Sequence, residues 1–251
     1  MNPSQSCILT YHSIDRSGSV ISVTPEMFRE HMTNLAGRRI VPLQDVQAIP
    51  GSVALTFDDG FRNFFEHALP ILQEFGYPAT VFLVSGYIGG RNDWPTQPSQ
   101  PYVPTIDLMS WSDVEQIVRL GIGLGAHTIT HPYLSRLGAE GIEREMADGK
   151  ARLEDRAGRK IDAFAYPYGD IDGRVRAAAE RHFTVACGTR LAFVNGRSDP
   201  LDLPRIDMFY LRQRFWFERL STSTGHAYLA LRASLRHLRG GQTQMSVPKT
   251  Q

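Results

Sequence analysis

Two aspartates stand side by side at the end of an apolar run, in the stretch LTFDDG over residues 55–60. Asp58 and Asp59 follow a predicted buried strand, and in parallel α/β folds functional side chains collect at the carboxyl ends of the strands. Two adjacent carboxylates repel each other in a dry pocket. The pair is therefore typical of a site in which a cation binds one carboxylate and keeps the other ionised.

Two histidines follow another apolar run. In GAHTITHP, residues 125–132, His127 and His131 lie four residues apart. Two imidazoles and one carboxylate can hold a divalent ion and leave positions open for water and substrate. This ligand set favours zinc, and cobalt or nickel would fit nearly as well. The combination indicates metal-assisted hydrolysis.

The elements that must position these residues alternate between short apolar runs and helical patterns, which is typical of a parallel sheet with crossover helices. Eight runs are predicted strands, a number that fits a closed barrel: 7–12, 39–43, 52–57, 79–84, 122–127, 163–167, 183–188 and 203–208. Apolar residues at helical spacing predict helices from Pro25 onward, over 64–75 and over 139–157. The proline- and glycine-rich stretch 86–104 is predicted to be a long loop.

Composition favours one large α/β domain, because 251 residues with 42% apolar content can build a full core. The formal net charge of +1 gives no indication of a nucleic-acid partner. From residue 212 onward, seven lysines or arginines stand against one acid. We therefore divide the chain into a barrel over 1–211 and a basic segment over 212–251, which is part of the same domain or appended to it. A monomer is the default expectation.

The N-terminal stretch has neither a positive n-region nor a long apolar h-region, and no 18 apolar residues run together. A cytoplasmic location is the expectation. Cys7 and Cys187 lie far apart in apolar runs, which favours buried free thiols over a disulfide.

Three motifs in a fixed order give the chain a resemblance to a known family. TFDDG (56–60), HTITH (127–131) and YPYG (166–169) resemble the motifs of the polysaccharide deacetylases of the NodB-homology group, carbohydrate esterase family four. The resemblance covers roughly residues 8–210. It implies a distorted (β/α) barrel of seven to eight strands that hydrolyses an acyl amide, usually the N-acetyl group of an amino sugar.

The same resemblance implies roles for individual residues. Asp59, His127 and His131 would bind the metal, and Asp58 would be the general base that accepts the proton of the attacking water. The backbone N–H of Tyr168 would stabilise the oxyanion that develops on the carbonyl.

The sequence also departs from the family pattern. Most members carry an arginine that steadies the base two residues before the proline of the third motif, where this chain has Ala165. The family's Asp-x-x-Asp-Trp motif is not evident either. A replacement cation is expected, and Arg205, at the end of the last predicted strand, is our candidate.

The general acid that protonates the leaving amine has two candidates. The family usually draws it from a C-terminal Leu-x-His strand, and the matching stretch here is 235–237, which has the pattern of a basic amphipathic helix. His12 closes the first predicted strand and so would lie at the barrel rim. A subgroup that acts on poly-N-acetylglucosamine resembles this chain in having such a Tyr-His strand, so we predict His12.

The helix predicted over 225–239 carries Tyr228, Leu231, Leu235 and Leu238 on one face, with three arginines beside them. Such a helix can lie weakly on an anionic membrane, or it can pack its apolar face on the barrel. Both alternatives stay open.

The sequence as a whole favours a metal-dependent sugar N-deacetylase that acts on a polysaccharide or a glycan precursor. The alternatives are a deacylase or deformylase of a lipid-linked sugar and a non-catalytic carbohydrate-binding relative, for which Ala165 would be the sign of lost catalysis.

Overall fold

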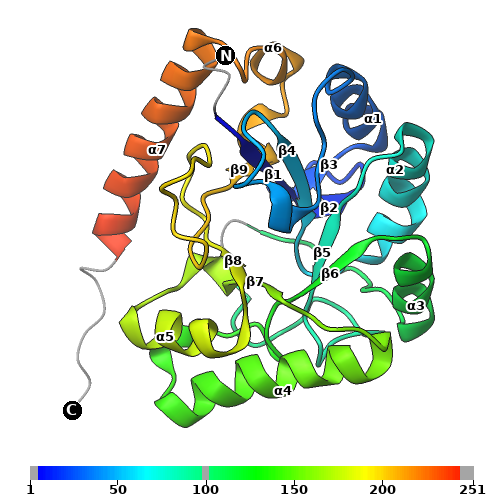
Figure 1. The fold of residues 1–251 in the computed structure, drawn as a ribbon, viewed down its shortest axis with the longest axis vertical. Helices are drawn as coiled ribbons and strands as arrows, with labels where there is room; N and C mark the ends of the chain where they lie inside the picture. The colour runs from blue at the N-terminus through cyan, green and yellow to red at the C-terminus, as the bar shows by residue number, and fades with distance from the viewer. Residues whose placement is uncertain (1–4, 98–101, 244–251) are drawn as a thin grey trace.

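The computed structural model describes residues 5–97 and 102–243, with side chains in the last helix described as far as residue 236. Its centre is a curled parallel sheet of seven strands in the order β8-β7-β6-β5-β4-β1-β9 (Figure 1). The strands are β1 Cys7–Tyr11, β4 Val53–Phe57, β5 Thr80–Leu83, β6 Gly123–Ala126, β7 Ala163–Ala165, β8 Val185–Cys187 and β9 Ile206–Asp207. The expected distorted barrel is thereby confirmed.

Strands β1 and β4 are buried at every position, as expected for parallel strands that are covered on both faces. Their register pairs Thr10 with Thr56, and the two hydroxyls lie 3.1 Å apart. The strands therefore end level with each other, and the N–H of Asp58 donates to the carbonyl of Tyr11. This register brings the residues that follow both strands to one edge of the sheet.

The barrel closes through an irregular seam between β8 and β9. Leu203 forms an isolated bridge with Cys187 at the end of β8, whereas Ile206 pairs with Leu9 of β1. The predicted strand over 203–208 is thus regular only in β9, and the residues before it cross from one side of the seam to the other. Arg205 lies in this crossing.

The predicted strand over 39–43 is wrong. Ile40 forms only an isolated bridge with Val53, and a 3₁₀ turn, η1, follows at Leu43–Asp45. Pro42 has no N–H to donate to a ladder, so pairing stops there. The short parallel pair β2 Ser13–Ile14 and β3 Ser22–Val23 was not predicted.

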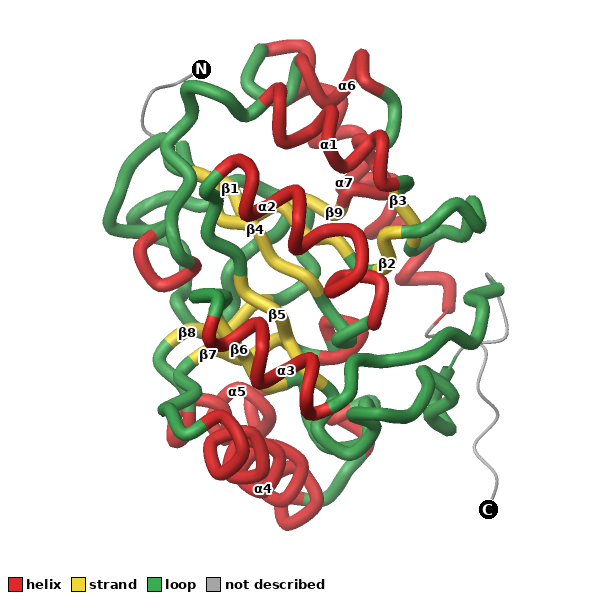
Figure 2. Tube along the Cα trace, turned by 90° about the vertical axis from the view of Figure 1, so that its right-hand side faces the viewer, coloured by secondary structure: helices red, strands yellow, loops and turns green. Residues whose placement is uncertain are grey.

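Helices surround the sheet (Figures 1 and 2). They are α1 Pro25–Asn34, α2 Leu69–Phe75, α3 Trp111–Arg119, α4 Ala139–Ala157, α5 Gly173–His182, α6 Arg214–Glu218 and α7 Ser223–Thr243. The predicted helices at Pro25 and over 139–157 are confirmed. The one over 64–75 divides into a wide turn, η2 Phe64–Ala68, and α2. Pro70 accounts for the division, because it lacks the N–H that would continue the helical pattern from Glu66.

The C-terminal helix α7 runs along the edge of the barrel beside α6 (Figure 1). Tyr228 stacks on Trp216 with ring centroids 3.9 Å apart, and Leu229 is buried. Leu231 and Leu235 stay 59% and 41% exposed. The predicted apolar face is therefore only partly buried, because Tyr228 packs on α6 while Leu231 and Leu235 are exposed to solvent. Among the described residues, no helix combines the length and apolarity needed to cross a membrane.

The two cysteines are free and buried, as predicted. Burial raises the pKa of both thiols to about 12, so neither is a reactive thiolate at neutral pH. Cys187 lies with Ala165 and Phe82 in the apolar cluster inside the barrel.

Candidate active site

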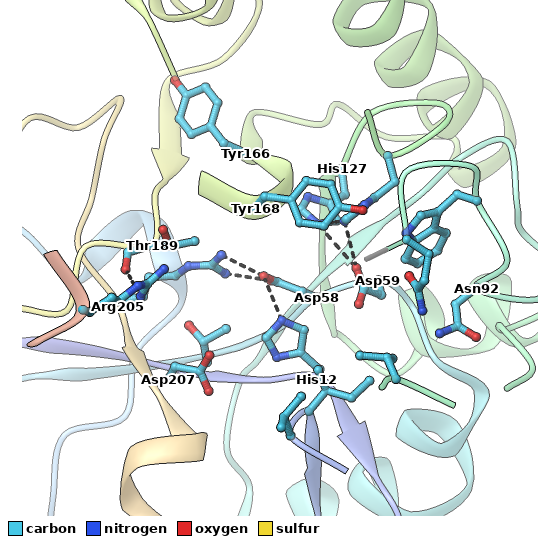
Figure 3. Close-up of a pocket in the computed structure, with 18 residues that line it drawn as sticks. His12, Asp58, Asp59, Asn92, His127, Tyr166, Tyr168, Thr189, Arg205 and Asp207 are labelled. Carbon is cyan, nitrogen blue, oxygen red and sulfur yellow. Dashed lines mark hydrogen bonds and ion pairs between the residues drawn. The ribbon is translucent and has the colours of Figure 1, made fainter. Parts of the chain in front are cut away.

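A cavity of about 400 Å³ opens at the carboxyl ends of the strands (Figure 3). It brings together all seven residues singled out from the sequence, which follow several different strands or loops: His12, Asp58, Asp59, His127, His131, Tyr168 and Arg205. Cavities of this size accommodate small ligands.

The two adjacent aspartates point in different directions because the chain turns sharply between them. Asp59 has φ 70°, and the N–H of Gly60 donates to the carbonyl of Asp58 at 2.9 Å. Asp58 consequently faces Arg205, and Asp59 faces the two histidines (Figure 3). The doubled aspartate of the motif thus places two carboxylates in two different surroundings.

Asp59, His127 and His131 form a compact triangle of metal-ligand atoms. The Oδ1 atom of Asp59 lies 3.5 Å from Nε2 of His127 and 3.3 Å from Nε2 of His131, and the two nitrogens are 3.2 Å apart. Ligands bound tetrahedrally at about 2.0–2.1 Å stand roughly 3.3 Å from one another. The three side chains therefore fit one divalent ion without rearrangement.

The surroundings of the triangle favour the ligand forms of these groups. Nδ1–H of His127 donates to the Ala165 carbonyl at 2.7 Å, which leaves the Nε2 lone pair directed at the site. Burial lowers the pKa of His131 and so favours its neutral form. Burial alone would raise the pKa of Asp59, but its close interactions with His127 and His131 outweigh burial and lower that pKa. The three side chains thus direct two imidazole nitrogens and one carboxylate oxygen at the same point.

Backbone strain is concentrated at the same place. Among the described residues, four non-glycine residues have positive φ: Asp59 at 70°, Thr128 at 67°, His131 at 57° and Tyr168 at 60°. All four belong to the three motifs found in the sequence. Such conformations persist where the surrounding structure imposes them, and they cluster at functional sites.

Arg205 makes a buried two-point ion pair with Asp58. Its two terminal nitrogens lie 2.7 Å from the two carboxylate oxygens, and its Nε donates to the carbonyl of Gly188 at 2.9 Å. Burial would raise the pKa of Asp58, but the charge of Arg205 outweighs it, so the pKa is lowered. Ala165 is fully buried. Ala165, at the end of β7, offers Asp58 no cation, and Arg205, just before β9, supplies the positive charge instead.

His12 stands on another side of the same carboxylate. Its Nε2 lies 3.8 Å from Oδ2 of Asp58, and its side chain is 21% exposed to the cavity. The alternative stretch 235–237 lies within helix α7, as its pattern predicts. The described side chains of that stretch do not include His237.

Tyr168 is fixed against the histidine side of the cavity. Its ring stacks on Tyr133 with centroids 4.2 Å apart and meets His131 edge-on at 4.6 Å. Its hydroxyl donates to the carbonyl of Thr96 at 3.0 Å, and burial raises its pKa to about 12. Tyr168 is therefore held as a neutral phenol with a left-handed backbone beside His131.

Comparison with known proteins places this geometry in a family. The family model described as polysaccharide deacetylase matches residues 45–185, which is more than half of the chain. The chain belongs to the polysaccharide deacetylase family. The matched region contains Asp58, Asp59, His127, His131 and Tyr168, whereas His12 and Arg205 lie outside it.

Two relatives within this group of polysaccharide deacetylases are similar to the chain in sequence. YxkH of Bacillus subtilis (strain 168), provisionally named a polysaccharide deacetylase, is 27% identical over 189 residues, which are 71% of this chain and 62% of YxkH. The poly-beta-1,6-N-acetyl-D-glucosamine N-deacetylase of Escherichia coli (strain K12) is 26% identical over 150 residues, 49% of this chain and 22% of that protein. The chain thus spans less than two thirds of either relative.

Solved structures support the fold. IcaB from Ammonifex degensii superposes with a TM-score of 0.72 at 22% identity, over 86% of this chain and 97% of that one. The Streptococcus pyogenes deacetylase PplD gives a TM-score of 0.70 at 22% identity, over 82% and 93% of the respective chains. At this identity the likeness establishes a shared architecture.

Glu145 is a buried acid beside the histidine motif, and it was not singled out from the sequence. It projects from α4, and its Oε2 accepts the N–H groups of Ile129 and Thr130 at 2.8 and 2.9 Å. Its Oε1 accepts the Thr130 hydroxyl at 2.8 Å. Gly149, one turn further on, lets α4 approach this loop, because a Cβ there would lie 3.3 Å from the Thr128 backbone. The sequence feature that could have revealed Glu145 is its position next to Met146, on the apolar face of α4.

Asn92 and Trp94 were also missed. Trp94 stacks on His131 with centroids 4.4 Å apart, and Asn92 pins its loop by accepting the N–H of Ile106 at 2.6 Å. Both line the cavity. They come from the predicted long loop, which has no periodicity from which a side chain's direction could be inferred.

Proposed function

We propose that the protein is a metal-dependent hydrolase that removes an N-acetyl group from an amino sugar of a polysaccharide or glycan precursor, in the synthesis of a surface polysaccharide. The observation that carries this proposal is the cavity in which a three-ligand triangle stands beside a carboxylate clamped by Arg205. Its relatives are named as deacetylases of N-acetylated glycans, including chitin and poly-N-acetylglucosamine.

An amide carbonyl resists attack by neutral water. A divalent ion held by Asp59, His127 and His131, with zinc the first choice and cobalt or nickel as alternatives, would polarise the carbonyl and acidify the attacking water. Asp58 accepts the proton of that water. Its ionised form is favoured by Arg205, which also fixes the direction of both carboxylate oxygens.

The remaining charge movements fall to two other residues. The backbone N–H of Tyr168 stabilises the developing oxyanion, and the strained conformation of this residue is part of that placement. His12 protonates the leaving amine, for which its position 3.8 Å from Asp58 is suited. Base and acid thus act from the same cavity.

Acetate release from N-acetylated oligosaccharides tests the proposal. Metal-stripped protein reloaded with zinc, cobalt or nickel should release acetate from β-1,4 or β-1,6 N-acetylglucosamine oligomers. Formate release from an N-formyl sugar would instead favour the deformylase alternative. Binding of the oligomers without any acyl release by the reloaded protein would identify a non-catalytic carbohydrate-binding relative.

Contact with a membrane is a separate proposal that rests on α7. Leu231 and Leu235 are exposed on this helix, in a segment with an excess of basic residues. Co-sedimentation with acidic liposomes at low salt should be stronger for the full chain than for its Leu231→Ser, Leu235→Ser variant. Equal binding of the two proteins, or no binding by either, would remove the membrane role.

A further inference from the structure

Helix α7 contributes one side chain to the wall of the cavity. Arg236 lines the cavity together with Thr189, which follows β8. The Nη1 of Arg236 donates to the Thr189 carbonyl at 2.7 Å. Thr189 lies on the same side of the site as Arg205 (Figure 3). The C-terminal segment therefore takes part in forming the site as well as packing against the barrel.

Within the described part of the chain, Arg236 forms no ion pair. Of the two arginines that line the cavity, Arg205 is neutralised by Asp58, but the interaction that Arg236 makes within the described chain is with a neutral carbonyl. Asp207 is on the same wall, where its Oδ1 accepts the N–H of Phe209 at 2.8 Å. The negative charge of Asp207 acts on Arg205 and Arg212. Arg236 thus presents a positive charge to whatever fills the cavity.

We propose that Arg236 binds an anionic group, a phosphate or a carboxylate, carried by the substrate next to its N-acetylated sugar. This inference rests on the proposed function and narrows its substrate class. A guanidinium recognises such groups through paired N–H donors, and with one Nη1 bond made to Thr189 the others stay available. Because that bond already holds the side chain, less conformational entropy is lost when the anion binds.

The surroundings of Arg236 support an anion. Over residues 223–236, helix α7 carries two arginines, Arg232 and Arg236, and no acid, so its charge next to the cavity attracts negative groups. Arg232, one turn earlier, provides a matched control. Its guanidinium lies over the rings of Tyr210 and Tyr228, at 5.2 and 6.0 Å, and it does not line the cavity.

Calorimetric binding to the metal-loaded full chain tests the inference. The probes are N-acetylglucosamine, N-acetylglucosamine 1-phosphate and a disaccharide of N-acetylglucosamine with a uronic acid. The wild-type protein should bind one of the anionic probes about tenfold more tightly than the neutral sugar, as expected for one charge-assisted contact. Arg236→Gln should lose this preference, whereas Arg232→Gln should keep it. The favoured probe tells whether the anion is a phosphate or a carboxylate.

Comparison of Arg236→Gln with Arg232→Gln separates a direct contact between the anion and Arg236 from two other causes of tighter anion binding. A phosphate that binds only the metal would show the same preference in both variants, because both keep the metal ligands. A general field of the basic helix would weaken equally in both. Either result overturns the inference, as does a wild-type protein without preference. The measurement needs no turnover, so an Arg236-dependent preference without acetate release would contradict the proposed function and leave the anion subsite standing.

Discussion

At the scale of single residues, the two neighbouring carboxylates of the site differ in the side chains that they contact. Asp59 faces the two imidazoles, and Asp58 faces a guanidinium. The sequence predicted this division from the motif and also predicted a cation other than the missing motif-three arginine. It could not predict that Arg205 approaches with two parallel hydrogen bonds, because that depends on the irregular seam before β9.

Removal of Arg205 should be costly. In Arg205→Met, the carboxylate of Asp58 would be buried without its partner, which typically destabilises a protein by about 3–5 kcal/mol. Urea denaturation measures this loss. The double variant Asp58→Asn, Arg205→Met should recover part of it, since no buried charge is then left alone. A double variant as unstable as the sum of the two single ones would show that the pair is not coupled.

His12 should act as the general acid. A general acid contributes about 10²- to 10⁴-fold, so His12→Ala should lower kcat by that order. His237→Ala is the control, because residue 237 lies on α7 and follows no barrel strand. Steady-state kinetics with an N-acetylglucosamine oligomer compares the two. A larger loss in His237→Ala than in His12→Ala would rule out this assignment.

At the scale of elements, some of the parts that position the motifs can be predicted from the sequence and others cannot. Strands β1 and β4 were predictable because both faces are buried and the residues form continuous apolar runs. The stretch 39–43 is also largely apolar, but Pro42 prevents it from pairing as a strand. The contacts of Trp94 and Glu145 could not be predicted, because they depend on how a loop and a helix pack on the histidine motif.

The contact between α4 and the histidine loop should determine metal affinity. Glu145→Ala removes the acceptor for two backbone N–H groups between the metal ligands, so His131 loses its fixed position. Partners of this kind typically contribute about 10- to 100-fold to metal affinity. Competition with a chromophoric chelator measures the zinc Kd. Glu145→Gln keeps an acceptor oxygen and should recover part of the affinity, and Glu140→Ala, in the first turn of α4, is the control.

An unchanged zinc Kd in Glu145→Ala, with thermal stability lowered, would assign Glu145 a purely structural role. The same lowering of zinc affinity in Glu140→Ala would also contradict the prediction. The hydrogen bonds to the histidine loop are made by Glu145, so removing the Glu140 carboxylate should leave them intact.

At the scale of the whole molecule, α1 and the C-terminal segment are joined by a buried histidine. The His31 ring stacks on Phe217 of α6 with centroids 4.0 Å apart, and its Nδ1 lies 3.1 Å from the hydroxyl of Tyr11. Burial lowers the pKa of His31 to about 4, against an ordinary value of 6.5. The folded protein therefore resists protonation of this ring more strongly than the unfolded chain does.

This difference predicts the direction of a pH effect on stability. Because the pKa is lower in the folded state, the contribution of neutral His31 is complete above about pH 6.5 and is lost as the pH falls toward 4. The full loss is on the order of 3 kcal/mol. Urea denaturation at several pH values should show a weaker pH dependence between 6.5 and 4 for His31→Gln than for the wild type. Parallel stability curves would show that His31 is not the group responsible.

The central claim for the molecule is that one metal, held by Asp59, His127 and His131, supports hydrolysis with Asp58 as the base. Acetate release from an N-acetylglucosamine oligomer, followed during titration of the stripped protein with zinc, tests it most directly. We predict that activity rises to a plateau at one zinc per chain. Asp58→Asn should bind the same zinc and show almost no turnover, and His127→Ala, His131→Ala should bind none. Full activity in the stripped protein, or in Asp58→Asn, would contradict the account.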